Sequence, residues 1–262
     1  MRPILVTGGT GTLGRVVVGG LVEAGREVRV VSRQPRPGGG SAAVTSLAVD
    51  LRGGGAGSGG GGGAGVDAAV AGVDTIIHCA TSPRGDVELS RHLAEAARRA
   101  GVGHLVYISI VGVDRVPLGY YRAKLAVERL VEASGLGWTI LRTTQFHDLV
   151  LRLFGLAARL PVMLVPGGVS VQPVDVREVA ARLVELALGP PAGRVPDMGG
   201  PQVRAAADLA RAYLRASGRR RLVLPVRLPG ATFAAYRAGG HLTPDHAAGR
   251  TTFEEFLEAR TA

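Results

Sequence analysis

The run TGGTGTLG at residues 7–14 is the stretch whose residue types and spacing most clearly suggest chemistry, with glycines at positions 8, 11 and 14. It follows an apolar run at residues 2–6 and precedes a helical pattern from Leu13 to Ala24. Glycines at this spacing permit a tight turn, and free N–H groups with the helix dipole attract an anion. The run predicts a pyrophosphate-binding loop, whereas the alternative is a glycine-rich turn without a ligand. The candidate contact residues are Thr7, Gly8, Thr10, Gly11, Thr12, Leu13 and Gly14.

The end of the second strand indicates which dinucleotide such a loop would hold. The alternating run at residues 27–32 ends at Ser32, and Arg33 and Arg36 follow it with no acidic residue nearby. An acid there would accept hydrogen bonds from the 2′-hydroxyl of NAD, whereas an arginine pairs with the 2′-phosphate of NADP. The pattern favours NADP(H), although a solvated arginine at a strand end would look the same. Asp50 and Leu51 close a third strand, where the acid could bond the adenine amino group or simply form a turn.

Lys124 is notable because of composition alone. Lysine and arginine total 31, yet Lys124 is the only lysine, and asparagine does not occur. A chain that uses arginine wherever a positive charge suffices has kept lysine at one place. Lysine and arginine differ most where a compact ammonium must fit a tight site. Lys124 is therefore a candidate functional residue, with chance retention as the alternative.

Strands and helices alternate along the first half of the chain, which predicts an α/β fold with a Rossmann-type doubly wound parallel sheet. After Thr143 the alternation loosens, and helices are expected at 144–160 and 174–188. We expect one NAD(P)-binding domain over residues 1–262, in which residues 143–262 form a small substrate-side lobe rather than an independent domain. The glycine-rich segment 53–65 is expected to be a flexible surface loop. The remaining expected strands are 45–50, 74–80, 104–110 and 138–142, and the remaining helices are 66–71, 87–100 and 120–134.

Composition narrows the function classes. The net charge is +10, but the basic residues are scattered along the chain. Their only dense run, Arg219–Arg221, has no interleaved aromatic residues, so no nucleic-acid partner is expected. No apolar run reaches about 18 residues, and the N-terminus lacks a signal-peptide pattern, so a cytoplasmic protein without membrane attachment is expected. Cys79 is the only cysteine, and no histidines or acids have metal-ligand spacing, so neither a disulfide nor a metal site is expected. Either a monomer or a homodimer fits.

Several motifs together resemble the short-chain dehydrogenase/reductase superfamily. They are TGGTGTLG, the Ser-Arg and Asp-Leu pairs that end the second and third strands, and HCA at residues 78–80. The stretch YISIVGVDRVPLGYYRAKLAVERLVEASGLGWTILR and the run PVDVREVA at residues 173–180 strengthen the likeness. The resemblance is closest to the extended and atypical branches, which include the NmrA-like NAD(P)H-binding proteins. It covers roughly residues 3–185.

The resemblance implies a catalytic Ser109 and a Y-x-x-x-K pair formed by Tyr120 and Lys124, in which NADPH delivers a hydride and the tyrosine supplies a proton. Tyr121 adjoins Tyr120, and either phenol could be the acid. The expected function is reduction of a ketone, quinone or similar small apolar molecule; the alternatives are a non-catalytic NADP(H) sensor of the NmrA-like type and a structural NADPH-holding subunit. An apolar helix at 149–160 fits an apolar substrate or core packing equally well. Ala80 and Thr81 are expected beside the nicotinamide, and Gln145, Phe146 and His147 near the substrate.

Overall fold

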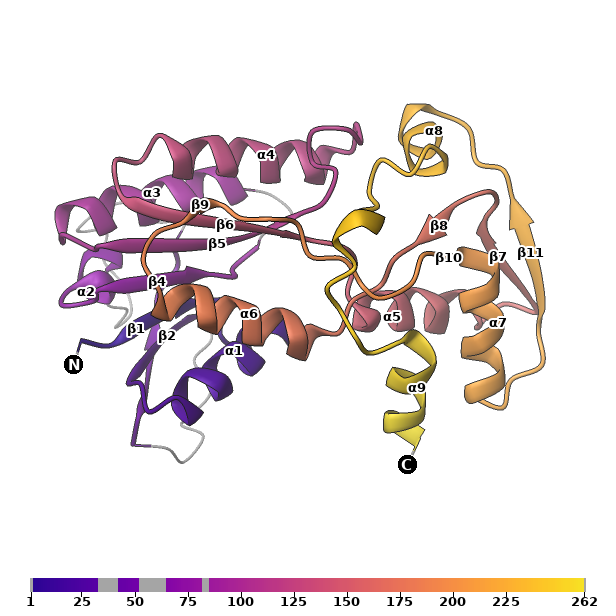
Figure 1. Ribbon diagram of the computed structural model, residues 1–262, viewed down its shortest axis with the longest axis horizontal. Coiled ribbons are helices and arrows are strands. Elements are labelled where there is room, and N and C mark those ends of the chain that lie inside the picture. Colours follow the sequence, from indigo (N-terminus) through magenta and orange to yellow (C-terminus); the bar gives the residue numbers. More distant parts are fainter. Residues whose placement is uncertain (1, 33–41, 52–64, 82–84, 262) are drawn as a thin grey trace. The chain divides into compact units, whose positions relative to one another are not determined.

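The computed structural model describes residues 2–32, 42–51, 65–81 and 85–261. These residues form two compact units (Figure 1). The first, called here the sheet unit, comprises residues 1–109, 123–141 and 180–195, and the second, called the lobe, comprises 110–122, 142–179 and 196–262. Arg33 and Arg36, and nearly all of the glycine-rich segment 53–65, lie outside the described residues.

The central element is a seven-stranded sheet with the strand order β3-β2-β1-β4-β5-β6-β9. The chain adds strands on one side of β1 and then returns to add the rest on the other, so the order reverses between β1 and β4. β1 pairs in parallel with both β2 and β4. This confirms the predicted doubly wound parallel sheet, whose reversal point is where such folds bind ligands. The strands are β1 (Ile4–Thr7), β2 (Val28–Ser32), β3 (Val44–Ala48), β4 (Thr75–His78), β5 (His104–Ile110), β6 (Gly137–Thr143) and β9 (Gly193–Arg194).

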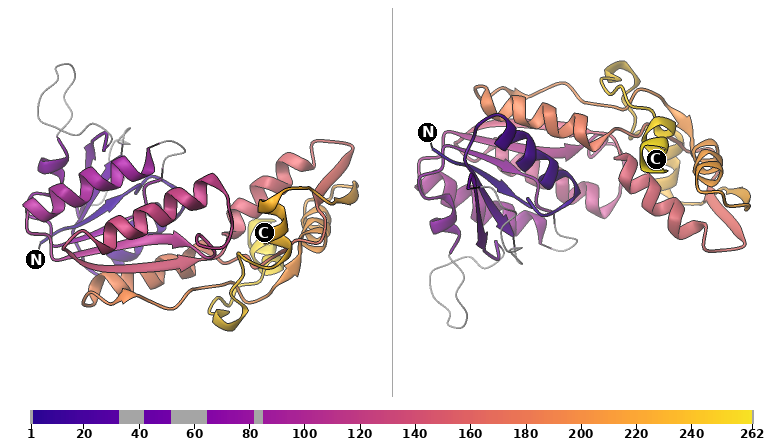
Figure 2. Two further views of the ribbon diagram at one scale, coloured as in Figure 1. Left: turned by 90° about the horizontal axis from the view of Figure 1, so that it is seen from above. Right: turned by 90° about the horizontal axis from the view of Figure 1, so that it is seen from below.

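Helices cover both faces of this sheet (Figures 1 and 2). α3 (Asp86–Arg99) and α4 (Gly119–Glu132) lie on one face, and α1 (Thr12–Glu23) and α6 (Val176–Leu188) lie on the other. A short α2 (Val66–Val70) precedes β4. In α3 the buried residues Leu89, Leu93, Ala96 and Ala97 recur at helical spacing and pack on the central strands. Apolar strands such as β1 and β4 are buried along their whole length because helices cover the sheet on both sides.

Two helices begin later than the sequence pattern indicates. α5 (His147–Ala157) starts after an extended segment in which Thr144 N–H donates to the Met198 carbonyl, a partner far along the chain. α6 starts at Val176 because the Asp175 carboxylate accepts a hydrogen bond from the Arg177 N–H at 2.7 Å, which caps the helix. In both cases a specific hydrogen bond sets the boundary that the apolar pattern alone leaves open.

The lobe has a core of its own, which includes Phe154, Met163, Leu209, Tyr213 and Phe256. Residues 110–122 belong to the lobe as well, whereas residues 180–195 belong to the sheet unit. No helix in the described part of the chain has the length and apolar character needed to cross a bilayer. Besides α5, the lobe contains β7 (Val162–Pro166), β8 (Ser170–Val171), β10 (Arg204–Ala205), α7 (Ala206–Ala216), β11 (Leu222–Val226), α8 (Ala231–Arg237), a short 3₁₀ turn (Pro244–His246) and α9 (Phe253–Thr261).

Gly112 provides a test of the packing inside the lobe. Its φ is +86°, and a Cβ at this position would lie 2.1 Å from the Gly240 carbonyl oxygen. Gly101 has a similar φ of +70°, but a Cβ there would meet nothing within 4 Å. We expect Gly101→Ala to cost about 1–2 kcal/mol for the left-handed conformation alone. Gly112→Ala should cost that amount plus roughly 1–3 kcal/mol for displaced backbone. Urea unfolding of both variants measures the difference, and equal losses would contradict the close approach to Gly240.

Candidate cofactor-binding and catalytic site

The loop after β1 is built around glycines that no larger residue can replace without a backbone shift. Gly8 has a φ of +69°, and a Cβ there would lie 2.8 Å from Ala80 Cα, in the segment after β4. A Cβ on Gly14 would lie 2.2 Å from the Gly8 carbonyl oxygen. At Gly11 the nearest atom would be 3.2 Å away. The three glycines of the motif therefore have different roles: Gly8 and Gly14 permit close backbone packing, while Gly11 lies at the exposed mouth of the loop.

The first turn of α1 is suited to hold an anion. Its N-cap residue, Gly11, has an extended backbone and offers no side-chain cap, and the first turn contains no acidic residue. Thr12 is exposed and Thr10 half-buried, whereas Leu13 is buried and anchors the helix to the core. Uncapped N–H groups at a helix start bind phosphate groups through hydrogen bonds and the helix dipole. The loop geometry fits the pyrophosphate of a dinucleotide.

A buried chain of hydrogen bonds links the ends of β1 and β4. Thr7 Oγ1 lies 2.7 Å from His78 Nδ1, and His78 Nε2 lies 2.9 Å from Ser90 Oγ. Ser90 donates its proton to the Asp86 carbonyl, so it accepts from His78 Nε2–H, and His78 Nδ1 accepts from the Thr7 hydroxyl. Thr7 Oγ1 in turn accepts from the Ala80 N–H at 3.2 Å. The chain fixes a neutral histidine and holds Ala80 beside the glycine loop.

Lys124 is buried, with 3% of its surface exposed, on the inner side of α4. Its ammonium donates to the Ile108 carbonyl at 3.4 Å and lies 4.0 Å from Asp86 Oδ2. It also lies 4.9 Å from the centre of the Tyr107 ring. Burial lowers the pKa of Lys124, and the Asp86 carboxylate opposes that effect. The residue singled out by composition is thus an enclosed cation rather than a solvated one.

Asp86 and Tyr107 were not among the sequence candidates. Asp86 is the first residue of α3, and Tyr107 lies in the middle of β5. Each residue fits an ordinary structural pattern, since acids favour helix starts and aromatic residues favour strands. No local signal identifies their contact with Lys124, because the contact exists only once α3, β5 and α4 are packed together.

Ser109, the next-to-last residue of β5, is 1% exposed. Its Oγ has no hydrogen-bond partner within the described ranges of the chain. A buried hydroxyl without a partner is costly, and such groups often mark a place where a ligand atom supplies the missing bond. The Ser109 hydroxyl is therefore suited to bind the oxygen of a substrate.

The two neighbouring tyrosines differ sharply in environment. Tyr120 is 40% exposed, whereas Tyr121 is 5% exposed and packs edge-on against Tyr236, with ring centres 6.4 Å apart. Burial, together with the adjacent Tyr236 phenol, raises the pKa of Tyr121 above its usual value. A phenol with a raised pKa that is removed from solvent is the poorer source of a proton near neutrality.

The remaining cofactor candidates have mixed environments. Ser32 at the end of β2 and Ala80 after β4 are half-buried. Asp50 is exposed, while the Leu51 side chain belongs to the core of the sheet unit. Thr81 is exposed, and its hydroxyl donates to Asp86 Oδ2 at 3.1 Å. Thr81 is thus tied to the same carboxylate that faces Lys124.

Among the substrate candidates, Gln145 and Phe146 are half-buried, but His147 has no exposed surface. The His147 ring stacks on Phe256 with centres 4.9 Å apart, and its Nε2 donates to the Thr251 carbonyl at 3.0 Å. Burial lowers the pKa of His147, which favours the neutral ring. In this structure His147 joins α5 to the C-terminal segment.

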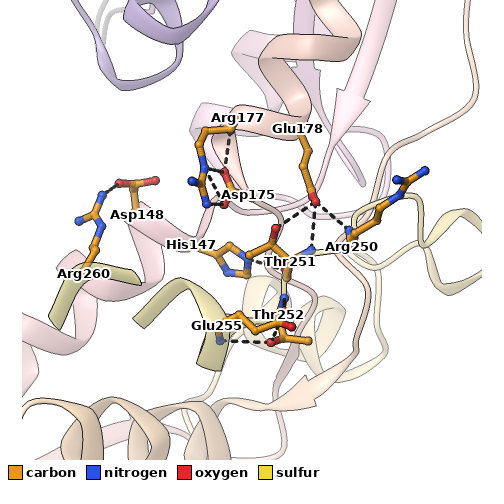
Figure 3. A network of polar contacts seen from close by, with 10 residues as sticks. All are labelled: His147, Asp148, Asp175, Arg177, Glu178, Arg250, Thr251, Thr252, Glu255 and Arg260. Carbon is orange, nitrogen blue, oxygen red and sulfur yellow. Dashed lines mark hydrogen bonds and ion pairs between the residues drawn. The ribbon is translucent and has the colours of Figure 1, made fainter. Parts of the chain in front are cut away.

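Figure 3 shows the polar network around His147 in the lobe. Glu178 Oε1 accepts from the N–H groups of Arg250 and Thr251 and from the Thr251 hydroxyl, at 3.0 to 3.1 Å. The Thr252 hydroxyl and N–H bond to the Glu255 carboxylate at the start of α9. Together these contacts fasten the segment before α9 to α5 and α6. The contacts of Glu178 and His147 join residues far apart in the chain, so no local pattern indicates them. Thr252 and Glu255 are only three residues apart and form a capping box at the start of α9.

Comparison with known proteins agrees with the geometry. The profile of a family described as NAD(P)H-binding matches residues 8–185. The chain is 32% identical over 220 residues to (4-alkanoyl-5-oxo-2,5-dihydrofuran-3-yl)methyl phosphate reductase of Streptomyces griseus, with 82% of this chain and 74% of the relative covered. It is 26% identical over 237 residues to quinone oxidoreductase 2 of Escherichia coli, with 88% and 80% covered.

Solved structures show the same fold. The structure of an NADPH-dependent quinone oxidoreductase from Escherichia coli in complex with NADPH has a TM-score of 0.80 against this chain. The comparison covers 99% of this chain and 100% of the other, at 19% identity. At that identity the likeness establishes the architecture rather than the activity.

Gly14 tests the loop as a cofactor cradle. Gly14→Ala would place a Cβ 2.2 Å from the Gly8 carbonyl oxygen, so the loop must open. We expect NADPH affinity to fall by roughly tenfold or more, because the pyrophosphate depends on that backbone. Gly19→Ala in the same helix meets nothing within 4 Å, and should leave affinity unchanged while adding about 0.5–1 kcal/mol of stability. NADPH fluorescence titration measures the affinities, and thermal unfolding measures the stabilities. Equal NADPH affinities of the two variants would argue against cofactor binding at this loop.

His78 predicts a pH dependence of stability. Burial, with a smaller contribution from the Lys124 charge, lowers the pKa of His78 to about 3 from 6.5. Between these two pKa values His78 is protonated in the unfolded chain but neutral in the folded chain. The folded state therefore loses stability as the pH falls from 6.5 toward 3. This one group should contribute a slope of about 1.4 kcal/mol per pH unit. Urea unfolding between pH 7 and 4.5 should show a shallower slope for His78→Gln, and identical slopes would refute the assignment.

Proposed function

Because the chain belongs to the NAD(P)H-binding family, we propose that it is an NADPH-dependent reductase of a ketone, quinone or similar small apolar molecule. Its relatives include NAD(P)H-dependent reductases, which supports an NAD(P)H-dependent oxidoreductase at the coarser level. The observation that carries the finer proposal is the buried ammonium of Lys124, the only lysine, on the helix that also contains Tyr120.

The proposed reaction assigns one task to each group. Bound NADPH supplies a hydride, two electrons with a proton, to the carbonyl carbon of the substrate. Tyr120 gives a proton to the carbonyl oxygen, which completes the alcohol, and solvent re-protonates its exposed phenol. The Lys124 ammonium favours the tyrosinate that forms, and the Ser109 hydroxyl donates to the oxygen as charge develops. These roles match the buried cation at Lys124 and the unpartnered oxygen at Ser109.

We assign the proton donor to Tyr120 rather than Tyr121. Tyr120 is the more exposed of the two, and the spacing to Lys124 is one helical turn. Tyr121 is buried against Tyr236 with a raised pKa, which makes its proton harder to release. The environment of each ring thus supports the choice that spacing alone favours.

The preference for NADPH over NADH is also part of the proposal. It rests on Ser32 at the end of β2 and on Arg33 and Arg36 just beyond the described residues, with no acid at the strand end. An apolar substrate is supported by α5, which buries Val150 and Phe154 in the lobe core but exposes Leu149 and Leu153 on its other side. Core packing therefore accounts for only one face of that helix.

The test is NADPH oxidation, followed by absorbance, with a panel of quinones and ketones. We expect Tyr120→Phe to lower kcat/KM by about 100-fold or more while NADPH affinity stays within a factor of about two. Tyr121→Phe is the matched control and should retain most of the activity. Loss of turnover in Tyr121→Phe instead would reassign the acid. Tight NADPH binding without turnover of any acceptor would replace the reductase by a cofactor-binding sensor.

A further inference from the structure

The Lys124 ammonium is enclosed by groups from several elements of the sheet unit. Asp86 of α3 lies 4.0 Å away and the Tyr107 ring of β5 lies 4.9 Å away. Cys79 and His78 face it from the end of β4, and Glu128, buried on α4 itself, follows one turn later. Asp86 is the acidic group that the packing of a different helix brings to this ammonium.

The Asp86 side chain is itself held in place. It is 4% exposed, and Oδ2, the oxygen nearest Lys124, also accepts a hydrogen bond from the Thr81 hydroxyl at 3.1 Å. The Asp86 backbone carbonyl accepts from Ser90 Oγ at 2.7 Å, which connects it to His78 and Thr7. Because both its carboxylate and its backbone are fixed, Asp86 presents a negative charge at a set position.

We propose that Asp86 is a positioning residue, whose carboxylate keeps the Lys124 side chain charged and directed at the Ile108 carbonyl. In the proposed reductase, which this inference presupposes for its catalytic consequence, the charged lysine then remains available to favour tyrosinate formation. The pairing itself does not depend on the reaction, because it is a property of the folded chain.

The magnitudes favour a role beyond packing. Burial alone drives an ammonium toward its neutral form, and an opposite charge within about 4–6 Å restores the charged form by 1–3 pKa units. The pair between Asp67 and Arg99 is shorter, at 2.6 Å, but both side chains are more than half exposed. Solvent screens such a surface pair, so its loss has little effect. Asp67→Asn is therefore a matched control for Asp86→Asn.

The single lysine makes the decisive measurement direct. Protein labelled with ¹³C-lysine carries one labelled side chain, and the ¹³Cε shift of Lys124 against pH gives its titration midpoint without substrate or cofactor. We expect Asp86→Asn to lower that midpoint by about 1 pH unit or more. Asp67→Asn should leave it unchanged, and Asp86→Glu, which keeps the carboxylate, should restore most of it. Asp86→Ser is a second neutral variant, suited to the first turn of a helix, for use if Asp86→Asn does not fold.

The activity readout follows the same logic. The basic limb of the kcat/KM profile should move to lower pH in Asp86→Asn by the shift seen for Lys124, and should stay in place in Asp67→Asn. An unchanged Lys124 midpoint in a folded neutral variant at position 86 overturns the proposal, even if the wild-type protein reduces quinones. If the Lys124 midpoint shifts but the wild-type protein turns over no acceptor, the Asp86–Lys124 pairing is supported and only the proposed reductase activity is contradicted.

Discussion

The close approach of two backbone segments at the reversal point of the sheet is the constraint on which the site depends. The loop after β1 and the segment after β4 touch where Gly8 meets Ala80, and Gly14 brings α1 down onto the same loop. Thr7 and His78 hold the two strand ends together from within the core. This packing leaves the start of α1 without a side-chain cap and without an acidic residue, which is the geometry that suits an anion.

The buried ion pair of Lys124 and Asp86 is the second feature of the site, and it lies close to β5, the neighbour of β4 in the sheet. Lys124, Asp86 and Tyr107 come from α4, α3 and β5, and the buried hydrogen-bond chain from Thr7 ends at the backbone of Asp86. Burying an ammonium is expensive unless another charge and polar groups surround it. A protein that retains a lysine there, in a chain otherwise supplied with arginine, is expected to use its compact charge. The anion loop and the buried cation are thus joined through one continuous set of contacts.

Local patterns predict much of this arrangement, and their failures have a common physical cause. Apolar runs and helical spacing predict the strands from β1 to β6, because those signals lie within each element. The two-residue strands β8, β9 and β10 carry no such signal, since partners distant in the chain define them. Lys124 stands out by composition, but Asp86 does not, because its significance arises only from the packing of α3 near α4. His147 directly follows β6, and its ring contacts with Phe253 and Phe256 cannot be read from the sequence around it, because these partners lie in the C-terminal segment.

The interleaving of the two units limits how this fold can diversify. The chain passes from one unit to the other after residues 109, 122, 141, 179 and 195, so each unit is assembled from three separate stretches. A lobe of this kind cannot be exchanged between relatives as a single contiguous cassette, because one crossover in the gene would divide both cores. Each unit must therefore change by substitutions within its own three stretches, while the five chain crossings that join it to the other unit stay in place.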